Sequence, residues 1–327
     1  MRLLLLGGTA HLGSTVATRA LARGHQVTCL ARGSADPPEG VTFVRGDRDD
    51  PDGLSAVRDE EWDVVVDVTR QPGQVRRAVS ELRTRHWVFV STANVYAAAS
   101  APGYDEDTPL LEPLEGEAMT SVEEYGPAKV ACERAVTEGA RAGGGTATLV
   151  RAGLIGGPGD DSARVGYWPW RLAHPSGPDV VVPDDLDFPV AFIDVRDIAA
   201  WVVHAAEQRL DGAFNVTGPP TTLGTVLEES ARVAGATVPL RPVPVAELTR
   251  LGVRPWMGPR SLPLWIDDPA LRHFAVMGTG RARAAGLHTR PLAETLADTL
   301  AYEEARESPR PVGLTDAEEQ EIRAALG

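Results

Sequence analysis

Lysine is almost absent from this chain. Of the 32 basic residues among 327, only Lys129 is a lysine, and the other 31 are arginines. Acidic residues number 46, so the net charge is −14. A nucleic-acid binder needs basic surface to neutralise phosphates, and this charge balance therefore argues against that class of function. The single lysine also raises a question: what does position 129 need that an arginine could not supply?

Cysteines and long apolar runs are also scarce. Cys29 and Cys132 are the only cysteines, too few for a disulfide framework, which favours a reducing compartment. The opening "MRLLLLGG" has four leucines before its glycines, shorter than the apolar core of a signal peptide, and no later run reaches the length of a membrane span. We therefore expect a cytoplasmic protein without a membrane partner, and we assign no metal site.

The first half of the chain alternates short apolar runs with helix-length amphipathic segments. Helices are predicted at 14–23 and 74–85. Strands regularly separated by helices predict a Rossmann-type, doubly wound parallel sheet of the α/β class. The predicted strands are 2–6, 26–30, 41–44, 64–68, 87–91 and 146–150.

The composition changes after about residue 155, where Gly, Pro, Asp and aromatic residues become frequent. Residues 1–155 are predicted to form a dinucleotide-binding domain, to which 190–217 ("FIDVRDIAAWVVHAA" and "GAFNVTG") return. Residues 156–189 and 218–327 are predicted to form a smaller substrate-binding lobe. Its tail has the pattern of a capping box, from Thr315 to Glu318, at the start of a surface helix.

A glycine-rich turn follows the first predicted strand. In "LLLLGGTAHLG" the spacing is G-x-x-A-x-x-G from Gly7 to Gly13, with Ala10 in the middle. Small residues let the backbone approach a pyrophosphate, and the next helix offers its N-terminal N–H groups. The strand before, the helix after and a second strand about 20 residues on are the context that a dinucleotide site requires.

The end of the second strand bears on the choice of dinucleotide. NAD sites usually place an acid there for the ribose hydroxyls, but "CLARGS" has Ala31, followed by Arg32 and Ser34. Arg32 suits a 2′-phosphate, so NADP(H) is favoured over NAD(H); the alternative is that Arg32 is one more exposed arginine. Asp47 is placed to bind the adenine amino group and Arg48 to cover the ring, although a plain loop fits this segment almost as well.

Tyr125 and Lys129 stand four residues apart in "YGPAK", and share one helix face if a helix begins near Pro127. A free tyrosine has a pKa near 10, and a nearby ammonium would favour its phenolate. Lysine can also hold two ribose hydroxyls in a way that a planar guanidinium does not. Ser91 and Thr92 end the strand 87–91, where parallel sheets place ligands. We predict Tyr125 and Lys129 as catalytic residues, with a hydroxyl of Ser91 or Thr92 as a third member, although these two residues taken alone fit a plain strand end better.

Taken together, "GGTAHLG", "GDR", "VFVSTANVY", "YGPAK", "LVRAGLIGGPGD", "FIDVRDIA" and "GAFNVTG" resemble the extended short-chain dehydrogenase/reductases, the group of NAD(P)-dependent epimerases, dehydratases and ketoreductases. The resemblance covers residues 1–217 and continues loosely to about 305. It implies Tyr125 as general acid/base, Lys129 and Thr92 as the other catalytic residues with Ser91 beside Thr92, and Gly153 and Leu154 against the nicotinamide. It also implies a homodimer formed by two sheet-flanking helices, with a monomer as the alternative. The expected cofactor-binding residues are Gly7, Thr9, Ala10, His11, Leu12, Arg32, Ser34, Asp47, Arg48, Val68, Thr69, Lys129, Gly153 and Leu154.

Two departures from the family pattern bear on the reaction. Sugar-nucleotide dehydratases of this family place an Asp-Glu pair after the catalytic threonine, whereas Ala93 and Asn94 stand here. Neither can act as a general acid or base, which argues against 4,6-dehydration. His11 and Ala10 replace the aromatic residue and the glycine often found in the turn, so a standard epimerase identity is in doubt. His11 is expected to have a structural role.

The substrate residues are predicted from aromatic side chains beside arginines, which could stack on a ring and hold an anion. Packing of the smaller lobe is an equally good interpretation of these residues. They are Asn94, Arg164, Tyr167, Trp168, Arg171 and Trp256.

The leading functional hypothesis is an NADP(H)-dependent ketoreductase that reduces a carbonyl of a small or medium-sized metabolite. The alternative is an NAD(P)-dependent sugar-nucleotide epimerase, which would retain NAD⁺ and consume no reducing equivalents. A second alternative is a dinucleotide-binding protein without chemistry, which the intact Thr92, Tyr125 and Lys129 disfavour.

Overall fold

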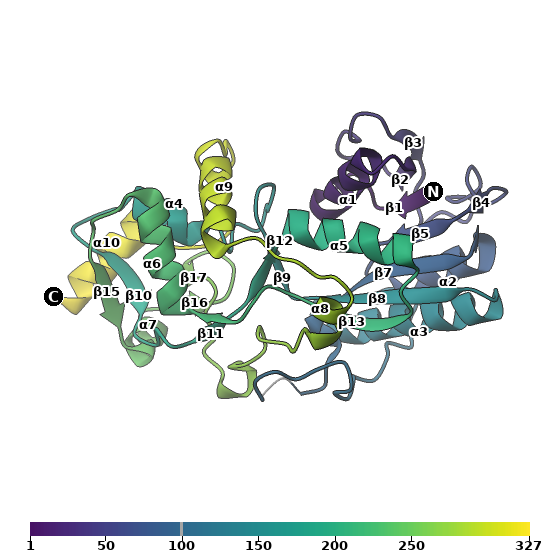
Figure 1. Cartoon of the computed structure of the whole chain (residues 1–327). Coiled ribbons are helices and arrows are strands. Elements are labelled where there is room, and N and C mark those ends of the chain that lie inside the picture. The colour runs from purple at the N-terminus through teal and green to yellow at the C-terminus, as the bar shows by residue number, and fades with distance from the viewer. Residues whose placement is uncertain (99–100) are drawn as a thin grey trace.

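A seven-stranded parallel sheet forms the centre of the fold (Figure 1). The computed structural model describes residues 1–98 and 101–327. In spatial order the strands are β13 (Gly212–Val216), β8 (Thr146–Ala152), β7 (His86–Thr92), β5 (Val64–Asp67), β1 (Arg2–Leu6), β2 (Gln26–Ala31) and β3 (Thr42–Arg45). All neighbouring pairs run parallel. The expected Rossmann-type fold is confirmed. The bounds of the six strands predicted from apolar runs agree with those of β1, β2, β3, β5, β7 and β8 within two residues at each end.

Helices cover both faces of this sheet, and the leucines of β1 alternate between them. Leu3 and Leu5 pack on the face that carries α1 and α5, whereas Leu4 and Leu6 pack on the face that carries α2 and α3. Burial on both faces explains why β1 is a continuous apolar run. The four helices are α1 (His11–Ala22), α5 (Val195–Gln208), α2 (Pro72–Glu81) and α3 (Tyr125–Ala142).

The C-terminal part of the chain has a core of its own, at the left of Figure 1. Its buried residues run from Ala163 to Ile322 and include Trp168 and Trp265. The main elements around it are α4 (Tyr167–Ala173), β10 (Val180–Pro183), α6 (Leu223–Ala234), β15 (Leu240–Val243), α7 (Val245–Arg250), α9 (Leu292–Glu304) and α10 (Asp316–Leu326). The predicted capping box is confirmed: the side chain of Thr315 accepts from the N–H of Glu318, and the carboxylate of Glu318 accepts from the N–H of Thr315.

The remaining elements of the described residues are short. They are β4 (Glu61–Trp62), β6 (Arg83–Thr84), η1 (Ala93–Val95), β9 (Leu154–Gly156), β11 (Pro189–Val190), β12 (Phe192–Asp194), β14 (Thr221–Thr222), β16 (Arg254–Pro255), β17 (Ser261–Leu262), η2 (Pro269–Leu271) and α8 (Gly280–Ala284). Strand β12 pairs with β9, whereas β13 pairs with β8 at the edge of the main sheet. The proposed division into 1–155 with 190–217, and 156–189 with 218–327, stays a prediction.

Helix boundaries differ from the prediction by up to four residues, and α1, for example, begins at His11 rather than at 14. Helix α3 begins at Tyr125 rather than near Pro127, because a proline is tolerated within the first turn, where its missing N–H costs no helical bond. Helix α2 ends at Glu81 instead of 85, because the backbone turns extended at Leu82 and then forms β6. Within the described residues, no helix has the length and apolar character that a membrane crossing requires.

The order of the strands locates the ligand crevice. The chain leaves β3 at one edge and returns to the centre through β5, on the other side of β1. Connections diverge at such a reversal, and a crevice opens at the carboxyl ends of the strands. Leu6, Ala31 and Thr92 are the last residues of three of these strands, so the turns that follow them face one another across this edge.

Candidate active site

A large cavity of about 1270 Å³ lies at this edge, lined by residues from Leu6 to Ala275. All fourteen residues predicted to bind the cofactor line it, together with Thr92, Tyr125, Asn94, Arg164 and Trp256. The structure thus brings together the glycine turn and the predicted catalytic residues around one space. The cavity runs from that turn and the end of β2 to side chains contributed by the C-terminal part of the chain.

The glycine turn allows a close backbone approach. Gly7 has φ of +96°, and a Cβ there would lie 2.6 Å from Cγ2 of Val68. At Gly13, in the first turn of α1, a Cβ would lie 2.2 Å from the carbonyl oxygen of Gly7. The side chain of Ala10 offers no cap at the start of α1, so the first N–H groups of the helix are available to an anion. These features fit the pyrophosphate of a dinucleotide.

The end of β2 carries no carboxylate. Ala31 is its last residue, and Ala31, Arg32 and Ser34 all line the cavity. Arg48 also lines it, but its guanidinium is tied to the carboxylate of Asp67 by bonds of 2.7 and 2.8 Å and also donates to a backbone carbonyl of α2. Arg48 is therefore held in a buried ion pair with Asp67. This pairing restricts the freedom of the Arg48 side chain to cover the adenine ring, as the sequence had predicted it would.

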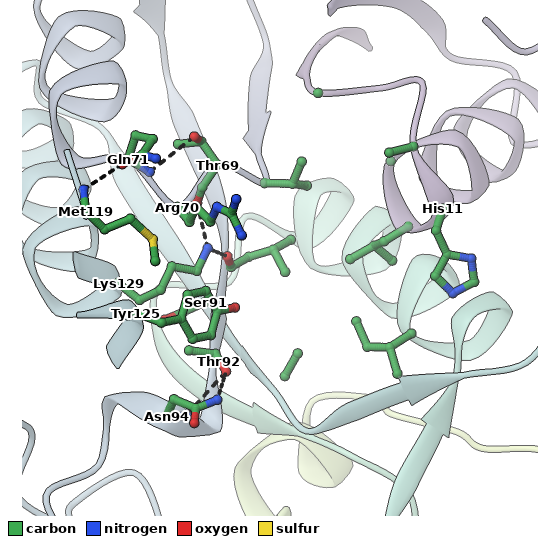
Figure 2. Close-up of a pocket in the computed structure, with 18 of the residues that line it drawn as sticks. His11, Thr69, Arg70, Gln71, Ser91, Thr92, Asn94, Met119, Tyr125 and Lys129 are labelled. Atoms are coloured by element: carbon green, nitrogen blue, oxygen red, sulfur yellow. Dashed lines mark hydrogen bonds between the residues drawn. The ribbon is translucent and has the colours of Figure 1, made fainter. Parts of the chain in front are cut away.

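Tyr125, Thr92 and Lys129 converge from α3 and the end of β7 (Figure 2). Tyr125 and Lys129 lie one helical turn apart on α3, as predicted, and the hydroxyl of Thr92 is among the groups that lower the pKa of Tyr125. Thr92 and Lys129 are buried. This arrangement places an acid/base group, a hydroxyl and an ammonium at one end of the cavity.

The ammonium of Lys129 is bound to the backbone. It donates to the carbonyl oxygens of Thr69 at 2.6 Å and Val90 at 2.5 Å, and it lies 4.4 Å from the centre of the Phe89 ring. An ammonium has three N–H donors, and these two carbonyls take two of them. One donor of Lys129 remains, and Lys129 lines the cavity. Burial lowers the pKa of Lys129 to about 8.

Lys129 is not among the main groups that shift the pKa of Tyr125, and its acidifying role stays a prediction. Burial raises the pKa of Tyr125 above its usual value, and the groups that oppose this rise are the Thr92 hydroxyl, Arg70 and Arg164. The physical reason is that the ammonium is directed to the carbonyls of Thr69 and Val90.

Two further polar side chains lie beside this group. The Oγ of Ser91 is buried and lacks a hydrogen-bond partner within the described residues. Asn94 donates its side-chain amide to Oγ1 of Thr92 at 3.0 Å and its backbone N–H to the same oxygen at 3.3 Å. Figure 2 shows Ser91, Thr92 and Asn94 in succession below Lys129, with His11 across the cavity.

His11 is the first residue of α1 and faces the loop after β9. Its Nε2 and one carboxylate oxygen of Asp160 are buried without partners inside the described ranges. Burial lowers the pKa of His11, and Asp160 is the largest opposing influence. Both residues line the cavity near the glycine turn. Among the residues described, no group of three or more His, Cys, Asp or Glu side chains could hold a metal ion.

The far end of the cavity combines one arginine with aromatic side chains. The guanidinium of Arg164 lies 5.1 Å from the Trp256 ring, and Phe274 meets that ring edge-on at 6.4 Å. Nε of Arg164 donates to Ser162, and its two terminal nitrogens have no hydrogen bond to other described residues, so they keep their donors for a ligand. Trp256 has φ of +68°, an unusual backbone state for a bulky residue that is frequent near functional sites.

Three predicted substrate residues lie elsewhere. Tyr167, Trp168 and Arg171 are in α4, buried in the C-terminal core, and they do not line the cavity. Arg171 is paired with Asp316, and Trp168 donates to the carbonyl of Pro263. Assigning these three to the substrate was therefore wrong; their aromatic and cationic groups hold α4 against the last segments of the chain.

Several lining residues were not anticipated. Arg70 and Gln71 follow the end of β5, and the carboxyl end of a parallel strand was a signal that could have indicated them. Met119, Met257 and Phe274 come from irregular segments without a motif. Their position depends on tertiary packing, which no local pattern reveals.

Comparisons with known proteins agree with this fold. The family model of the NAD dependent epimerase/dehydratase family matches residues 3–217. A search of curated proteins finds no match.

Solved structures match over nearly the whole chain. A provisionally assigned epimerase from Burkholderia cenocepacia J2315 is 22% identical with a TM-score of 0.71, covering 93% of this chain and 98% of that one. UDP-glucose 4-epimerase from Thermotoga maritima, solved with UDP-glucose, is 18% identical (TM-score 0.65, 93% and 99% covered). The UDP-glucose 4-epimerase from Thermus thermophilus, in complex with NAD, is 20% identical (TM-score 0.63, 93% and 99% covered). At these identities the likeness concerns the fold.

Proposed function

The chain belongs to the NAD dependent epimerase/dehydratase family, and from this premise we propose that it interconverts a secondary alcohol and a ketone on a sugar nucleotide, as an epimerase does. The observation that carries the proposal is the convergence of Thr92, Tyr125 and Lys129 on the cavity that begins at the glycine turn. When bound, the nicotinamide dinucleotide supplies and accepts hydride. The protein supplies binding, orientation and the movement of one proton.

Tyr125 is the group that moves the proton. As a phenolate it accepts the proton of the substrate hydroxyl, and as a phenol it returns it to the carbonyl oxygen. Because burial raises its pKa, the phenolate needs stabilising neighbours, and the Thr92 hydroxyl and the positive charges of Arg70 and Arg164 act in that direction. Lys129 would use its remaining N–H to hold the ribose of the cofactor, with Gly7 and Gly13 giving room for the pyrophosphate.

Two observations support a sugar nucleotide as substrate. Arg164 offers two unbonded guanidinium nitrogens to an anionic group such as a diphosphate, next to the flat ring of Trp256. The similar Thermotoga maritima enzyme was solved with UDP-glucose. The Asp-Glu pair of 4,6-dehydratases is missing at Ala93 and Asn94, which favours epimerisation over dehydration.

The test begins with the purified protein and a panel of nucleoside diphosphate sugars. We expect conversion to an epimer without net change in absorbance at the wavelength of the reduced nicotinamide. Tyr125→Phe should lower turnover about 100-fold or more while dinucleotide affinity stays within about twofold, since the phenol oxygen acts only in proton transfer. A Tyr125→Phe variant that retains turnover would contradict the role of Tyr125.

A second candidate is net reduction of a carbonyl by NADPH, and two observations favour it. Ala31 and Arg32 suit a 2′-phosphate better than a free ribose diol. The mouth of the cavity is also apolar, with Val122 75% and Met257 53% exposed at its rim, which suits a less polar ketone. Steady consumption of NADPH with ketones, together with no epimer from any sugar nucleotide, would select this candidate.

A further inference from the structure

The side chain of His11 has an unsatisfied ring nitrogen at the wall of the cavity. His11 is the first residue of α1, where the helix offers free N–H groups to a pyrophosphate, and Figure 2 shows its ring across the cavity from Tyr125. A Cβ at Gly159 would lie 3.0 Å from Nδ1 of His11, so the ring rests on the loop that follows β9. Its Nε2 is buried and has no hydrogen-bond partner within the described residues.

Asp160, on the same loop, carries an acceptor that is also unused. It is 6% exposed and lines the same cavity. Its Oδ1 accepts from the N–H of Ser162 at 2.9 Å, whereas its Oδ2 is buried without a partner in the part of the chain that the structure describes. The cations nearby bind other groups. Arg164 donates through Nε to Ser162, and Arg306 donates to the backbone oxygen of Asp160 and to Glu303.

A bound pyrophosphate would place a second anion beside His11. A neutral imidazole has one N–H, so it can donate either to the carboxylate of Asp160 or to the phosphate, whereas an imidazolium has two N–H groups and can donate to both. Two anions without a cation between them also repel each other, and a positive ring removes that repulsion. The charge state of His11 that fits the complex is therefore the protonated one.

We propose that His11 takes up a proton when the dinucleotide binds, and that the imidazolium then donates one N–H to Asp160 and the other to the pyrophosphate. The proton comes from the solvent, and the only covalent change is the N–H bond that forms on the ring. This inference rests on the dinucleotide binding in the proposed function. It gives a binding role to a residue that was expected from the sequence to be structural.

The acids that face His11 come from two elements. Asp160 and Asp161 lie on the loop after β9, and Asp194 is the N-cap residue of α5, whereas the first turn of α1 has no acid. The cations that pair with Asp194 are Arg196 and Arg290. Asp161 accepts from the hydroxyl of Tyr302 at 3.3 Å. Asp160 is thus the acid whose charge is least compensated.

The direction of the pH dependence follows from the charges. Burial lowers the pKa of His11 in the free protein, so the ring is neutral near pH 7.5, and Asp160 is the strongest influence in the other direction. A pyrophosphate adds negative charge and raises the pKa further. The complex therefore has the higher pKa, and between the two values binding takes up a proton. Affinity is highest below the pKa of the free protein and falls as the pH rises through that of the complex.

The experiment is isothermal titration calorimetry of the full-length protein from pH 6 to pH 9, with NADH or NADPH, whichever binds more tightly. Runs at pH 7.5 in two buffers of different ionisation enthalpy give the number of protons taken up. For the wild type we expect about half to one proton per dinucleotide, and a Kd that rises about tenfold or more over the pH range. Any titration of the dinucleotide itself is common to all variants and cancels in the comparison.

Two substitutions remove the titrating ring in different ways. His11→Phe keeps a flat ring and His11→Gln keeps a neutral donor, and both should bind the dinucleotide with almost no proton uptake and a flatter pH profile. Asp160→Asn should keep part of the uptake, because the phosphate still favours the imidazolium. His174→Phe is the matched control: His174 is half-exposed and does not line the cavity, so this variant should behave as the wild type does.

The outcomes for this inference and for the proposed function are separate. Wild-type proton uptake in both His11 variants would overturn the inference, and so would a weaker affinity with an unchanged pH profile, which is the result that a mere packing role gives. If the wild type binds a dinucleotide without proton uptake, the proposed function stands and only the role of His11 fails. If the wild type binds neither dinucleotide, the proposed function fails and this inference fails with it.

Discussion

Replacing Lys129 by methionine tests the cost of burying the only lysine of the chain. Methionine has a similar length and no charge, so it fills the same space between Phe89 and the carbonyls of Thr69 and Val90. The variant removes two hydrogen bonds and also removes the penalty of a buried ammonium. Because these effects oppose each other, the pH dependence of stability is more informative than stability at one pH.

The magnitude follows from the pKa. Burial lowers the pKa of Lys129 from its usual 10.5 to about 8, which corresponds to about 3 kcal/mol against the charged form. Between these two values the unfolded chain binds a proton that the folded chain has released, so the free energy of unfolding rises with pH. From pH 7 to pH 10 the contribution of Lys129 becomes more favourable by about 2.5 kcal/mol.

The assay is equilibrium denaturation of the wild type and of Lys129→Met at pH 7 and pH 10. Tyrosines and cysteines also titrate in this range, but they are common to both proteins and cancel in the difference. At pH 7 the two should be about equally stable, since two unsatisfied carbonyls, at about 1–3 kcal/mol each, offset the relieved charge. At pH 10 the wild type should be more stable by about 2–3 kcal/mol. A difference that does not change between the two pH values would refute the reasoning.

Two further predictions concern the dinucleotide. Ala31→Asp puts a carboxylate where the 2′-phosphate would lie, so the ratio of NADPH to NADH affinity should fall about tenfold or more, measured by fluorescence titration. No change in that ratio would show that the end of β2 does not contact the ribose. Gly13→Ala places a Cβ 2.2 Å from the carbonyl oxygen of Gly7, so dinucleotide affinity should fall about tenfold or more, whereas Gly280→Ala, which has open space around it, should leave it unchanged. Equal affinities in these two glycine variants would contradict the close approach at the turn.

The sheet and the glycine turn were predictable because their signals are local. A run such as "RLLLL" can be buried on both faces, and the turn after it needs small residues whatever the rest of the chain does. The same holds for Tyr125 and Lys129, whose spacing places them one turn apart on α3. These elements positioned most of the predicted cofactor residues around one cavity.

The orientation of the arginines was not predictable in this way. Arg164 and Arg171 are seven residues apart in one segment rich in aromatic residues, yet only Arg164 lines the cavity. Arg171 is paired with Asp316, which lies 145 residues further along the chain. The acceptors of Lys129 are two backbone carbonyls. Every residue has such a carbonyl, so the residue types in the sequence do not show which ones accept from Lys129. In both cases the partner is set by tertiary packing.

The late return of β13 limits how this protein can be divided. Strand β8 ends at Ala152, but its outer hydrogen-bonding edge is filled only by β13, which begins at Gly212. A fragment that stopped near residue 155 would leave β8 as an open edge, able to pair with strands of other molecules. The nucleotide-binding half should therefore aggregate when it is expressed without the segment through Val216, and grafted or split versions of the protein should keep that segment attached.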